Sequence, residues 1–382
     1  LVEHTKAPVR RDLMDEIDWS DRLIGIKGTR GVGKTTFLLQ YAKEKFGTDR
    51  SCLFINMNNF YFSGHSIVDF AYEFQKRGGK VLLIDQVFKH PEWSRELRMC
   101  YDRFPNLKIV FTGSSVMRLK EENLELRDIA KSYNLRGFSF REYLNLQTGM
   151  KFRAYSLEEI LSTHEQIAKG VLSKVRPLDY FQDYLHHGFY PFFLEKRNFS
   201  ENLLKTMNMM VEVDILLIKQ IELKYLSKIK KLLYLLAVDG PKAPNVSQLA
   251  SDIQTSRATV MNYIKYLADA RLINLVYPKG EEFPKKPSKI MMHNSNLMYS
   301  IYPVKVEEQD VLDTFFVNSL WKDHKVHKGD KNVSFMVDEV MPFKICQEGA
   351  KIKNNPNVTY ALHKAEIGRG NQIPLWMFGF LY

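Results

Sequence analysis

A glycine-rich segment near the start of the chain constrains the fold more than any other stretch. Residues 28–36 read GTRGVGKTT and fit the pattern Gly-x-x-x-x-Gly-Lys-Thr, with the apolar residues 23–27 before them and an amphipathic pattern after them. Only residues without a Cβ let successive backbone N–H groups curl around a phosphate chain. The segment therefore predicts a strand, a phosphate-binding loop and a helix, rather than an ordinary turn before a surface helix.

Each part of this loop has its own expected task. Lys34 should supply the point charge that reaches the β and γ phosphates, while the hydroxyl of Thr35 should coordinate Mg²⁺. The start of the following helix adds partial positive charge, which favours a bound anion. We therefore expect ATP to be contacted by the loop residues Gly28, Arg30, Gly31, Val32, Gly33, Lys34, Thr35 and Thr36.

A second apolar stretch supplies the carboxylate that such a site needs. Residues 80–87 read KVLLIDQV, and their apolar residues, typical of a buried parallel strand, end at Asp85. A strand this apolar has little other use for a terminal acid. We therefore expect Asp85 to lie in the Mg²⁺ shell.

The residue after Asp85 departs from the usual chemistry of an ATPase. An acidic residue commonly follows and acts as general base on the attacking water, but here the residue is Gln86. An amide can hold a water molecule and cannot take its proton, so binding should survive while hydrolysis is strongly slowed. Gln86 is either natural, as in a pseudo-enzyme, or a Glu-to-Gln change introduced to trap the ATP state; with the rest of the site intact, we favour the introduced change.

The next apolar strand ends in polar residues that could sense the γ-phosphate. Thr112 closes this strand, and Ser114 or Ser115 follows at its tip. Of these, Ser114 is our candidate catalytic sensor, alongside Lys34 and Gln86. Arg118 and Arg127 lie downstream and either contact a phosphate, in the same or a neighbouring subunit, or are ordinary surface arginines.

The composition indicates a globular protein with more than one domain. The 382 residues exceed what one hydrophobic core usually serves, and 45% of them are hydrophobic. Lysine and arginine outnumber aspartate and glutamate by 55 to 44. This excess fits a polyanionic partner and fits equally well a basic, well-solvated surface around a nucleotide pocket.

Cysteine usage and hydropathy predict the location of the protein. Cys52, Cys100 and Cys346 are far apart and lack metal-binding spacing, so we expect neither a disulfide framework nor a zinc site. No apolar run approaches the length of a membrane span, and residues 1–11 lack the apolar core of a signal peptide. We therefore expect a cytoplasmic protein without membrane association.

A helix-turn-helix pattern occupies the third quarter of the chain. Residues 228–236, 246–253 and 256–267 each show helical apolar spacing, and the strand patterns 272–277 and 289–292 flank a basic turn. This order predicts a winged helix, which serves as a structural lid, docks a protein or binds duplex DNA. In the DNA-binding case the contacts would come from Arg257, Thr259, Asn262, Lys265, Lys279, Lys285, Lys286 and Lys289.

Two further stretches suggest parts of a lid and of a last domain. Tyr190 and Pro191 follow Gly188 in an aromatic turn, which could touch the adenine or sugar of ATP or could simply pack in a core. Residues 294–382 mix helical and strand patterns, which predicts a small α/β domain. Its very apolar end, residues 373–382, should form a buried final strand.

Taken together, these stretches resemble a family of prokaryotic AAA-type P-loop ATPases. The family has an N-terminal ATPase core, a winged helix and a C-terminal domain of unknown function related to restriction-endonuclease folds. It is also similar to the STAND-type signalling ATPases, in which a Gly-x-Pro turn of the lid contacts nucleotide. The motifs that carry the resemblance are GTRGVGKTTFLLQ, VLLIDQVFKHPEWSREL, VFTGSS, LRGFSFREYL, YLHHGFYPFF, DTFFVNSL and IPLWMFGFLY.

The resemblance implies an α/β fold of four parts. These are a P-loop core with a parallel sheet, a helical lid, a winged helix and a nuclease-like α/β domain, over residues 1–150, 151–222, 223–293 and 294–382 respectively. Two departures stand out, the first being Gln86 in place of Glu. The second lies in the last domain, where Phe343-Lys344-Ile345-Cys346 replaces the Glu-x-Lys of a metal-dependent nuclease and Asp338 and Glu339 fall in a predicted turn. We therefore expect this domain to be catalytically inactive.

Three hypotheses follow. The leading one is an ATPase that binds Mg·ATP and switches conformation with it, held in the ATP state by Gln86. The second is a DNA-handling protein whose grip on duplex DNA is regulated by ATP. The third is an inert assembly protein with ATP as a structural cofactor. Because AAA relatives often form rings, a homo-oligomer is also expected, with duplex DNA or a protein as the further partner.

Overall fold

The chain forms two compact units. The computed structural model describes residues 1–119, 123–195, 197–352 and 355–382. The first unit consists of residues 1–137 and 212–222, and the second of residues 138–211 and 223–382. The chain thus passes from one unit to the other after residues 137, 211 and 222. A short segment far along the sequence therefore completes the first unit.

The first unit is built on a five-stranded parallel sheet, as the motifs predict. Its strands are β1 (Leu23–Gly28), β2 (Cys52–Asn56), β3 (Val81–Asp85), β4 (Lys108–Ser114) and β5 (Lys131–Asn134). Their order across the sheet is β2-β3-β4-β1-β5. Strand β4 therefore lies between the strand that leads into the glycine-rich loop and the strand that carries Asp85.

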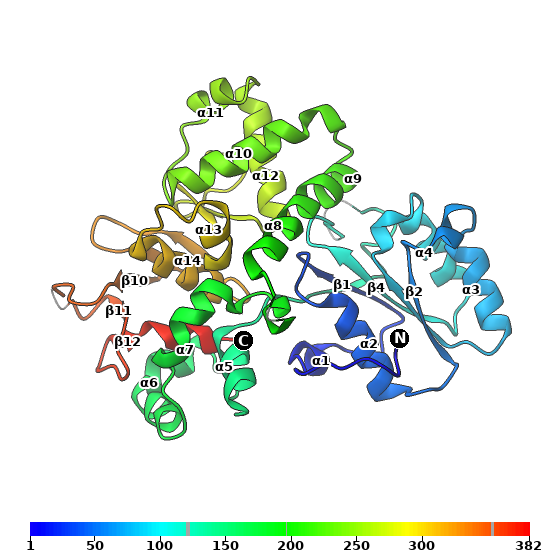
Figure 1. Ribbon diagram of the computed structural model, residues 1–382, viewed down its shortest axis with the longest axis horizontal. Helices are drawn as coiled ribbons and strands as arrows, with labels where there is room; N and C mark the ends of the chain where they lie inside the picture. Colours follow the sequence, from blue (N-terminus) through cyan, green and yellow to red (C-terminus); the bar gives the residue numbers. More distant parts are fainter. Residues whose placement is uncertain (120–122, 196, 353–354) are drawn as a thin grey trace. The chain divides into compact units, whose positions relative to one another are not determined.

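Helices cover both faces of this sheet (Figure 1). The helices of this unit are α1 (Leu13–Glu16), α2 (Lys34–Lys45), α3 (Ile67–Lys76), α4 (Trp93–Arg103) and, from the returning segment, α9 (Leu216–Lys219). The connection from β1 to β2 runs across the sheet in the opposite direction to the connections through α3 and α4. Since such crossovers are right-handed, α2 lies on one face while α3 and α4 share the other.

The second unit contains nine α-helices among its described residues. These are α5 (Phe140–Thr148), α6 (Leu157–Leu172), α7 (Leu178–Asp183), α8 (Phe199–Met209), α10 (Leu226–Asp239), α11 (Val246–Asp252), α12 (Arg257–Asp269), α13 (Ser295–Ile301) and α14 (Glu308–Leu320). Helix α14 lies deep in the unit, where Phe315 and Phe316 join a large apolar cluster that includes Trp376 and Phe378. The helix is buried on all sides, including polar residues such as Asp313 and Asn318.

Helices α10, α11 and α12 precede a two-stranded antiparallel sheet of β6 (Ile273–Val276) and β7 (Lys289–Met292). The apolar residues expected to point inward are buried, among them Leu249, Val260 and Ile264. Ser256 caps α12, as its sequence predicts, because its side chain accepts a hydrogen bond from Thr259 N. The order of elements agrees with the expected one, and the assignment of a winged helix stays a prediction.

A mixed five-stranded sheet ends the second unit. Its strands, in the order β12-β11-β10-β9-β8, are β8 (Val326–Lys328), β9 (Phe335–Val337), β10 (Met341–Cys346), β11 (Thr359–Leu362) and β12 (Gln372–Pro374). Asp338 and Glu339 have positive φ and form the turn between β9 and β10, as predicted. Asp338 binds the ring of His324 at 2.6 Å, so it has a structural partner.

The prediction of a buried final strand over residues 373–382 is wrong in its conformation. Only Ile373 and Pro374 belong to β12, and Leu375–Phe380 form a 3₁₀ helix. The segment is buried, as expected, with Trp376 and Phe378 in the core. A short apolar run has no period that separates a strand from a helical turn, so packing decides between them.

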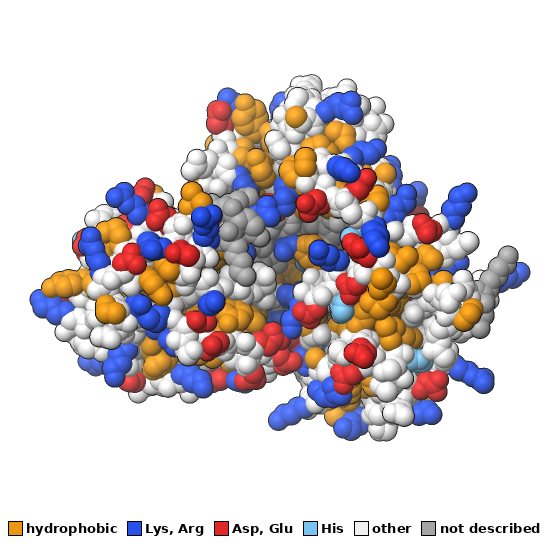
Figure 2. Space-filling model, turned by 180° about the vertical axis from the view of Figure 1, so that it is seen from behind, with side chains coloured by type: hydrophobic (Ala, Val, Ile, Leu, Met, Phe, Trp, Pro, Cys, Tyr) orange, Lys and Arg blue, Asp and Glu red, His pale blue; other side chains and the backbone are white. Residues whose placement is uncertain are grey.

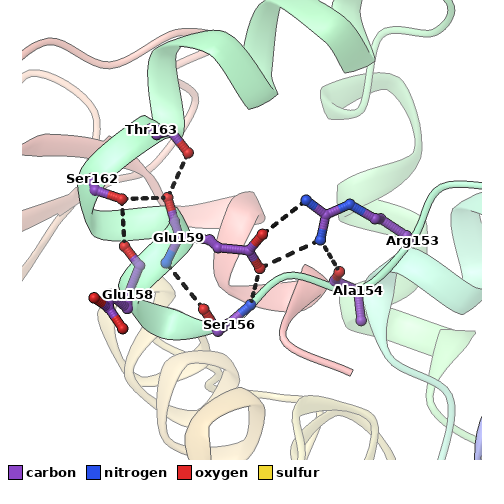
Figure 3. Close-up of polar contacts among 7 residues, drawn as sticks. All are labelled: Arg153, Ala154, Ser156, Glu158, Glu159, Ser162 and Thr163. Carbon is purple, nitrogen blue, oxygen red and sulfur yellow. Dashed lines mark hydrogen bonds and ion pairs between the residues drawn. The ribbon is translucent and has the colours of Figure 1, made fainter.

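A hydrogen-bonded cap fixes the start of α6 (Figure 3). The hydroxyl of Ser156 accepts from Glu159 N at 3.1 Å, and the Glu159 carboxylate accepts from Ser156 N at 2.8 Å. Arg153 donates to the same carboxylate at 2.8 Å and lowers the pKa of Glu159 to about 2. One turn later, Ser162 and Thr163 donate to backbone carbonyls, and the helix kinks at Thr163, as such back-bonding side chains favour.

Removing this cap tests the importance of the α6 start. Ser156→Ala should lower the free energy of unfolding by about 1 kcal/mol, because one N–H of the first turn loses its acceptor. Urea denaturation followed by circular dichroism measures this change. Ser162→Ala on the same helix is the matched control, expected to stay within about 0.5 kcal/mol of the parent. Equal effects of the two substitutions would contradict the assignment.

Candidate functional site

The predicted phosphate and metal ligands of the first unit meet at the carboxyl edge of its sheet. Gly28 at the end of β1 lies beside Ser114 at the end of β4, and Asn56 at the end of β2 lies beside Asp85 at the end of β3. Ligands of open parallel sheets bind at this edge. Residues from separate parts of the sequence are therefore brought to one place by strand register alone.

Two different constraints require glycine in the loop. Gly33, which precedes α2, has φ of 93°, a conformation that residues with a side chain rarely adopt. At Gly28 the limit is space, because a Cβ would lie 2.4 Å from the carbonyl oxygen of Leu135. The loop can thus present its N–H groups only with glycine at these positions.

Lys34 is folded back onto the loop that it follows. Its ammonium donates to the carbonyl oxygens of Gly28 and Thr29, each at 2.8 Å. Burial lowers the pKa of Lys34 to about 8, although the carboxylates of Asp214 and Asp85 oppose the shift. The buried ammonium is therefore in place to bind a phosphate, whose negative charge would compensate the positive charge of the lysine.

Asp85 is held by three hydrogen-bond donors. The hydroxyl of Thr112 donates to one carboxylate oxygen at 2.6 Å, while Thr35 and Asn56 each donate to the other at 2.8 Å. Thr112 also accepts from the backbone N–H of Gln86 at 2.9 Å. Asp85 is 1% exposed, so these bonds offset the cost of burying its carboxylate.

Gln86 adopts the left-handed conformation directly after β3, with φ of 55°. Such a backbone costs a residue with a side chain about 1–3 kcal/mol, and it tends to occur at functional sites. The side-chain oxygen of Gln86 and the hydroxyl of Ser115 are buried and lack a hydrogen-bond partner among the described residues. Unpaired buried oxygens at this edge indicate room for a polar ligand or for water.

The donor set also suits a hard cation. Thr35 supplies a hydroxyl beside the Asp85 carboxylate, and Mg²⁺ typically takes one or two protein oxygens and completes its shell with phosphates and water. Over the described parts of the chain, no group of three or more His, Cys, Asp and Glu residues could hold a metal on its own. Thr35 and Asp85 are the residues that would hold Mg²⁺ beside a bound phosphate.

One residue of the site was not anticipated from the sequence. Asp214, in the segment that returns to the first unit, is 3% exposed and accepts from Arg30 at 2.5 Å and from Ser114 at 3.1 Å. The signal was present, because Asp214 stands in the apolar run VEVDILLIK much as Asp85 stands in VLLIDQV. It was missed because a distant segment shows no link to the loop in the sequence.

The remaining predicted contacts of the nucleotide lie in the second unit. Tyr190 is completely buried, its ring packs against Phe192, and its hydroxyl accepts from Asn294 at 3.1 Å. Burial raises the pKa of Tyr190 well above its usual range. Pro191 begins a 3₁₀ turn (Pro191–Glu195) and is partly exposed. A role for Tyr190 and Pro191 in nucleotide binding stays a prediction.

The residues expected to face DNA differ in their freedom. Arg257 and Asn262 on α12 are exposed, as are Lys285 and Lys286 in the turn between β6 and β7. Four of the lysines form ion pairs, and these are Lys265 with Asp269, Lys279 with Glu339, Lys285 with Glu281 and Lys289 with Asp313. Neutralised lysines offer a phosphate backbone less charge than the sequence suggests.

Two family models match parts of the chain. Residues 20–144 match the AAA domain, which agrees with the parallel sheet and with the loop around Lys34. Residues 178–305 match a domain of unknown function, DUF8612. Within the described part of the chain, no helix is both long and apolar enough to cross a bilayer.

Two curated relatives each match about two thirds of the chain. The uncharacterized protein MJ1637 of Methanocaldococcus jannaschii is 30% identical over 274 residues, which is 68% of this chain and 57% of that protein. A second protein of the same organism, uncharacterized protein MJ1544, is 25% identical over 66% of this chain and 55% of its own length. The chain thus spans little more than half the length of these relatives.

Solved structures give only distant likenesses. One is RuvB of Thermotoga maritima, with TM-score 0.29 and 16% identity over 67% of this chain and 82% of that chain. Another is the ORC1 protein of Aeropyrum pernix in complex with DNA, with TM-score 0.32 and 12% identity over 74% of this chain and 87% of that chain. TM-scores this low do not establish a common fold over the whole length.

The lowered pKa of Lys34 predicts a pH dependence of phosphate binding. Phosphate binding requires the charged form of Lys34. When the pH is above the lysine's pKa of about 8, Lys34 must first take up a proton before phosphate binds. The affinity for Mg·ATP should therefore fall about tenfold between pH 7 and pH 9. Calorimetry at both pH values measures this fall. Lys34→Arg, which stays charged throughout, should show no comparable loss; parallel curves would contradict the prediction.

Proposed function

Because residues 20–144 belong to the AAA domain family of P-loop ATPases, we propose that the chain binds Mg·ATP at the carboxyl edge of its parallel sheet and uses it as a conformational switch. In this proposal Lys34 and the loop amides bind the phosphates. Thr35 and Asp85 would hold Mg²⁺, which supplies positive charge between the β and γ phosphates. Thr36 at the start of α2 is exposed and available to a further phosphate oxygen.

The observation that carries this proposal is the bonding of Asp85. Its three donors come from α2, β2 and β4, so the carboxylate lies where the loop helix and two neighbouring strands meet. A carboxylate with only a structural task would not need the hydroxyl of the residue that follows the loop lysine. Thr35 and Asp85 are thus preorganised around one position beside the loop.

Hydrolysis is the part of the function that Gln86 limits. The backbone of Gln86 is fixed by Thr112, and its side-chain oxygen is buried without a partner among the described residues. An amide there orients a water molecule and cannot accept its proton. We therefore propose a slow ATPase that dwells in its ATP-bound state.

Restoring a proton acceptor tests this role. Gln86→Glu should raise the ATPase rate by at least about tenfold, because a general base typically contributes a hundredfold or more. Phosphate release under saturating Mg·ATP measures the rate. Gln86→Ala is the control for loss of the side chain, and it should not exceed the parent rate. A Glu variant no faster than the parent would contradict this account.

Removing the lysine tests nucleotide binding itself. Lys34→Ala should abolish the heat of Mg·ATP binding in calorimetry, because the point charge at the β and γ phosphates is lost. Retention of binding would refute the proposed site. If Lys34→Ala leaves thermal stability and assembly like those of the parent while the parent hydrolyses no ATP, an inert assembly protein is favoured instead.

ATP-regulated DNA binding is the second candidate, and exposed polar residues of α12 favour it. Arg257 and Asn262 face solvent on the helix that a DNA-binding winged helix places in the major groove. Figure 2, however, displays basic side chains spread over the visible face with acidic ones between them, and not gathered in one patch. We therefore rank DNA binding second.

A salt series on labelled duplex DNA tests the second candidate. DNA binding through this domain should weaken steeply with salt, and Arg257→Ala should reduce affinity at every salt concentration. A fluorescence anisotropy titration measures both effects. Lys265→Ala serves as the matched control on α12, because Lys265 is already paired with Asp269. Absence of binding even at low salt would remove this candidate.

A further inference from the structure

Asp214 accepts hydrogen bonds from the same groups that the site would offer to a terminal phosphate. One carboxylate oxygen accepts from Arg30 of the loop at 2.5 Å, and the other accepts from Ser114 at the tip of β4 at 3.1 Å. Arg30 and Ser114 are also the loop and sensor residues from which phosphate contacts are expected. A planar carboxylate and a tetrahedral phosphate compete for the same donors, since both are oxyanions that accept charge-assisted hydrogen bonds.

The surroundings of Asp214 are those of an anion site. The side chain is 3% exposed, and its negative charge opposes the lowering of the pKa that burial imposes on both Lys34 and Lys89. Three cations thus face one carboxylate that is not part of the loop. A γ-phosphate brought to Arg30 and Lys34 would be repelled by Asp214 unless that side chain moved.

The local backbone gives Asp214 a way to move. It lies in a π-helical turn, Met210–Ile215, followed by the short helix α9. Turns of this kind are rare, less favourable than α-helix and common at functional sites. Residues 212–222 belong to the first unit, while the residues on either side belong to the second.

We propose that Asp214 is a specificity residue that discriminates ATP from ADP by competing with the γ-phosphate for Arg30 and Ser114. The inference rests on the proposed ATP site. ADP binds with Asp214 in place, because its phosphates need only the loop amides and Lys34. ATP binds only when Asp214 gives up both hydrogen bonds, so the segment 212–222 changes position with the γ-phosphate and not with the nucleotide as such.

The experiment compares two nucleotides on three proteins. Calorimetry with Mg·ADP and with Mg·ATPγS, a slowly hydrolysed ATP analogue, is run on the parent, on Asp214→Asn and on Glu212→Gln. Asp214→Asn should tighten Mg·ATPγS binding at least about tenfold and leave Mg·ADP within about threefold, because charge-assisted hydrogen bonds no longer have to be broken. Glu212, an exposed acid two residues away, is the matched control and should change neither affinity.

Each outcome decides between explanations. An unchanged ratio of the two affinities in Asp214→Asn, or an equal gain in Glu212→Gln, would overturn the inference while leaving the ATP site intact. If no protein binds either nucleotide, the proposed function falls and the inference with it. Amide hydrogen exchange of residues 210–222 in the parent protein gives a second measurement that needs no variant. Exchange should rise with Mg·ATPγS and not with Mg·ADP, and equal exchange would count against the inference.

Discussion

The fixed position of the Asp85 carboxylate is the interaction on which the rest of the site depends. Three donors from three elements converge on it, and each is placed by the register of the sheet or by the first turn of α2. The cost of burying this charge is offset only when all of these elements are in place. The geometry of the nucleotide pocket therefore depends on correct assembly of the sheet.

Much of the first unit could be predicted because its signals are local. The loop around Gly33 needs glycine for conformational reasons, and the apolar run before Asp85 reads as a buried strand whatever else the chain contains. Residues 20–144 match the AAA domain, which agrees with the P-loop core expected from these motifs. These features depend on residues that are close in sequence, so a single sequence is enough to predict them.

What could not be predicted depends on packing between distant residues. Asp214 joins the loop from about 180 positions away, as the separation from Arg30 shows, and no periodicity links the two. The conformation at the end of the chain was predicted wrongly for a different reason. Leu375–Phe380 are apolar enough for a buried strand, but they form a 3₁₀ helix in the core. Both outcomes are decided by the tertiary environment, which a local pattern does not contain.

The path of the chain between its two units limits how the protein can be divided. Since residues 212–222 belong to the first unit, no continuous stretch that ends at residue 137 contains all of it. A protein cut there would lose the partner of Arg30 and expose the apolar surface that α9 covers. A separately expressed ATPase fragment would have to carry the returning peptide, either by fusion or by addition in trans, to reproduce the native pocket.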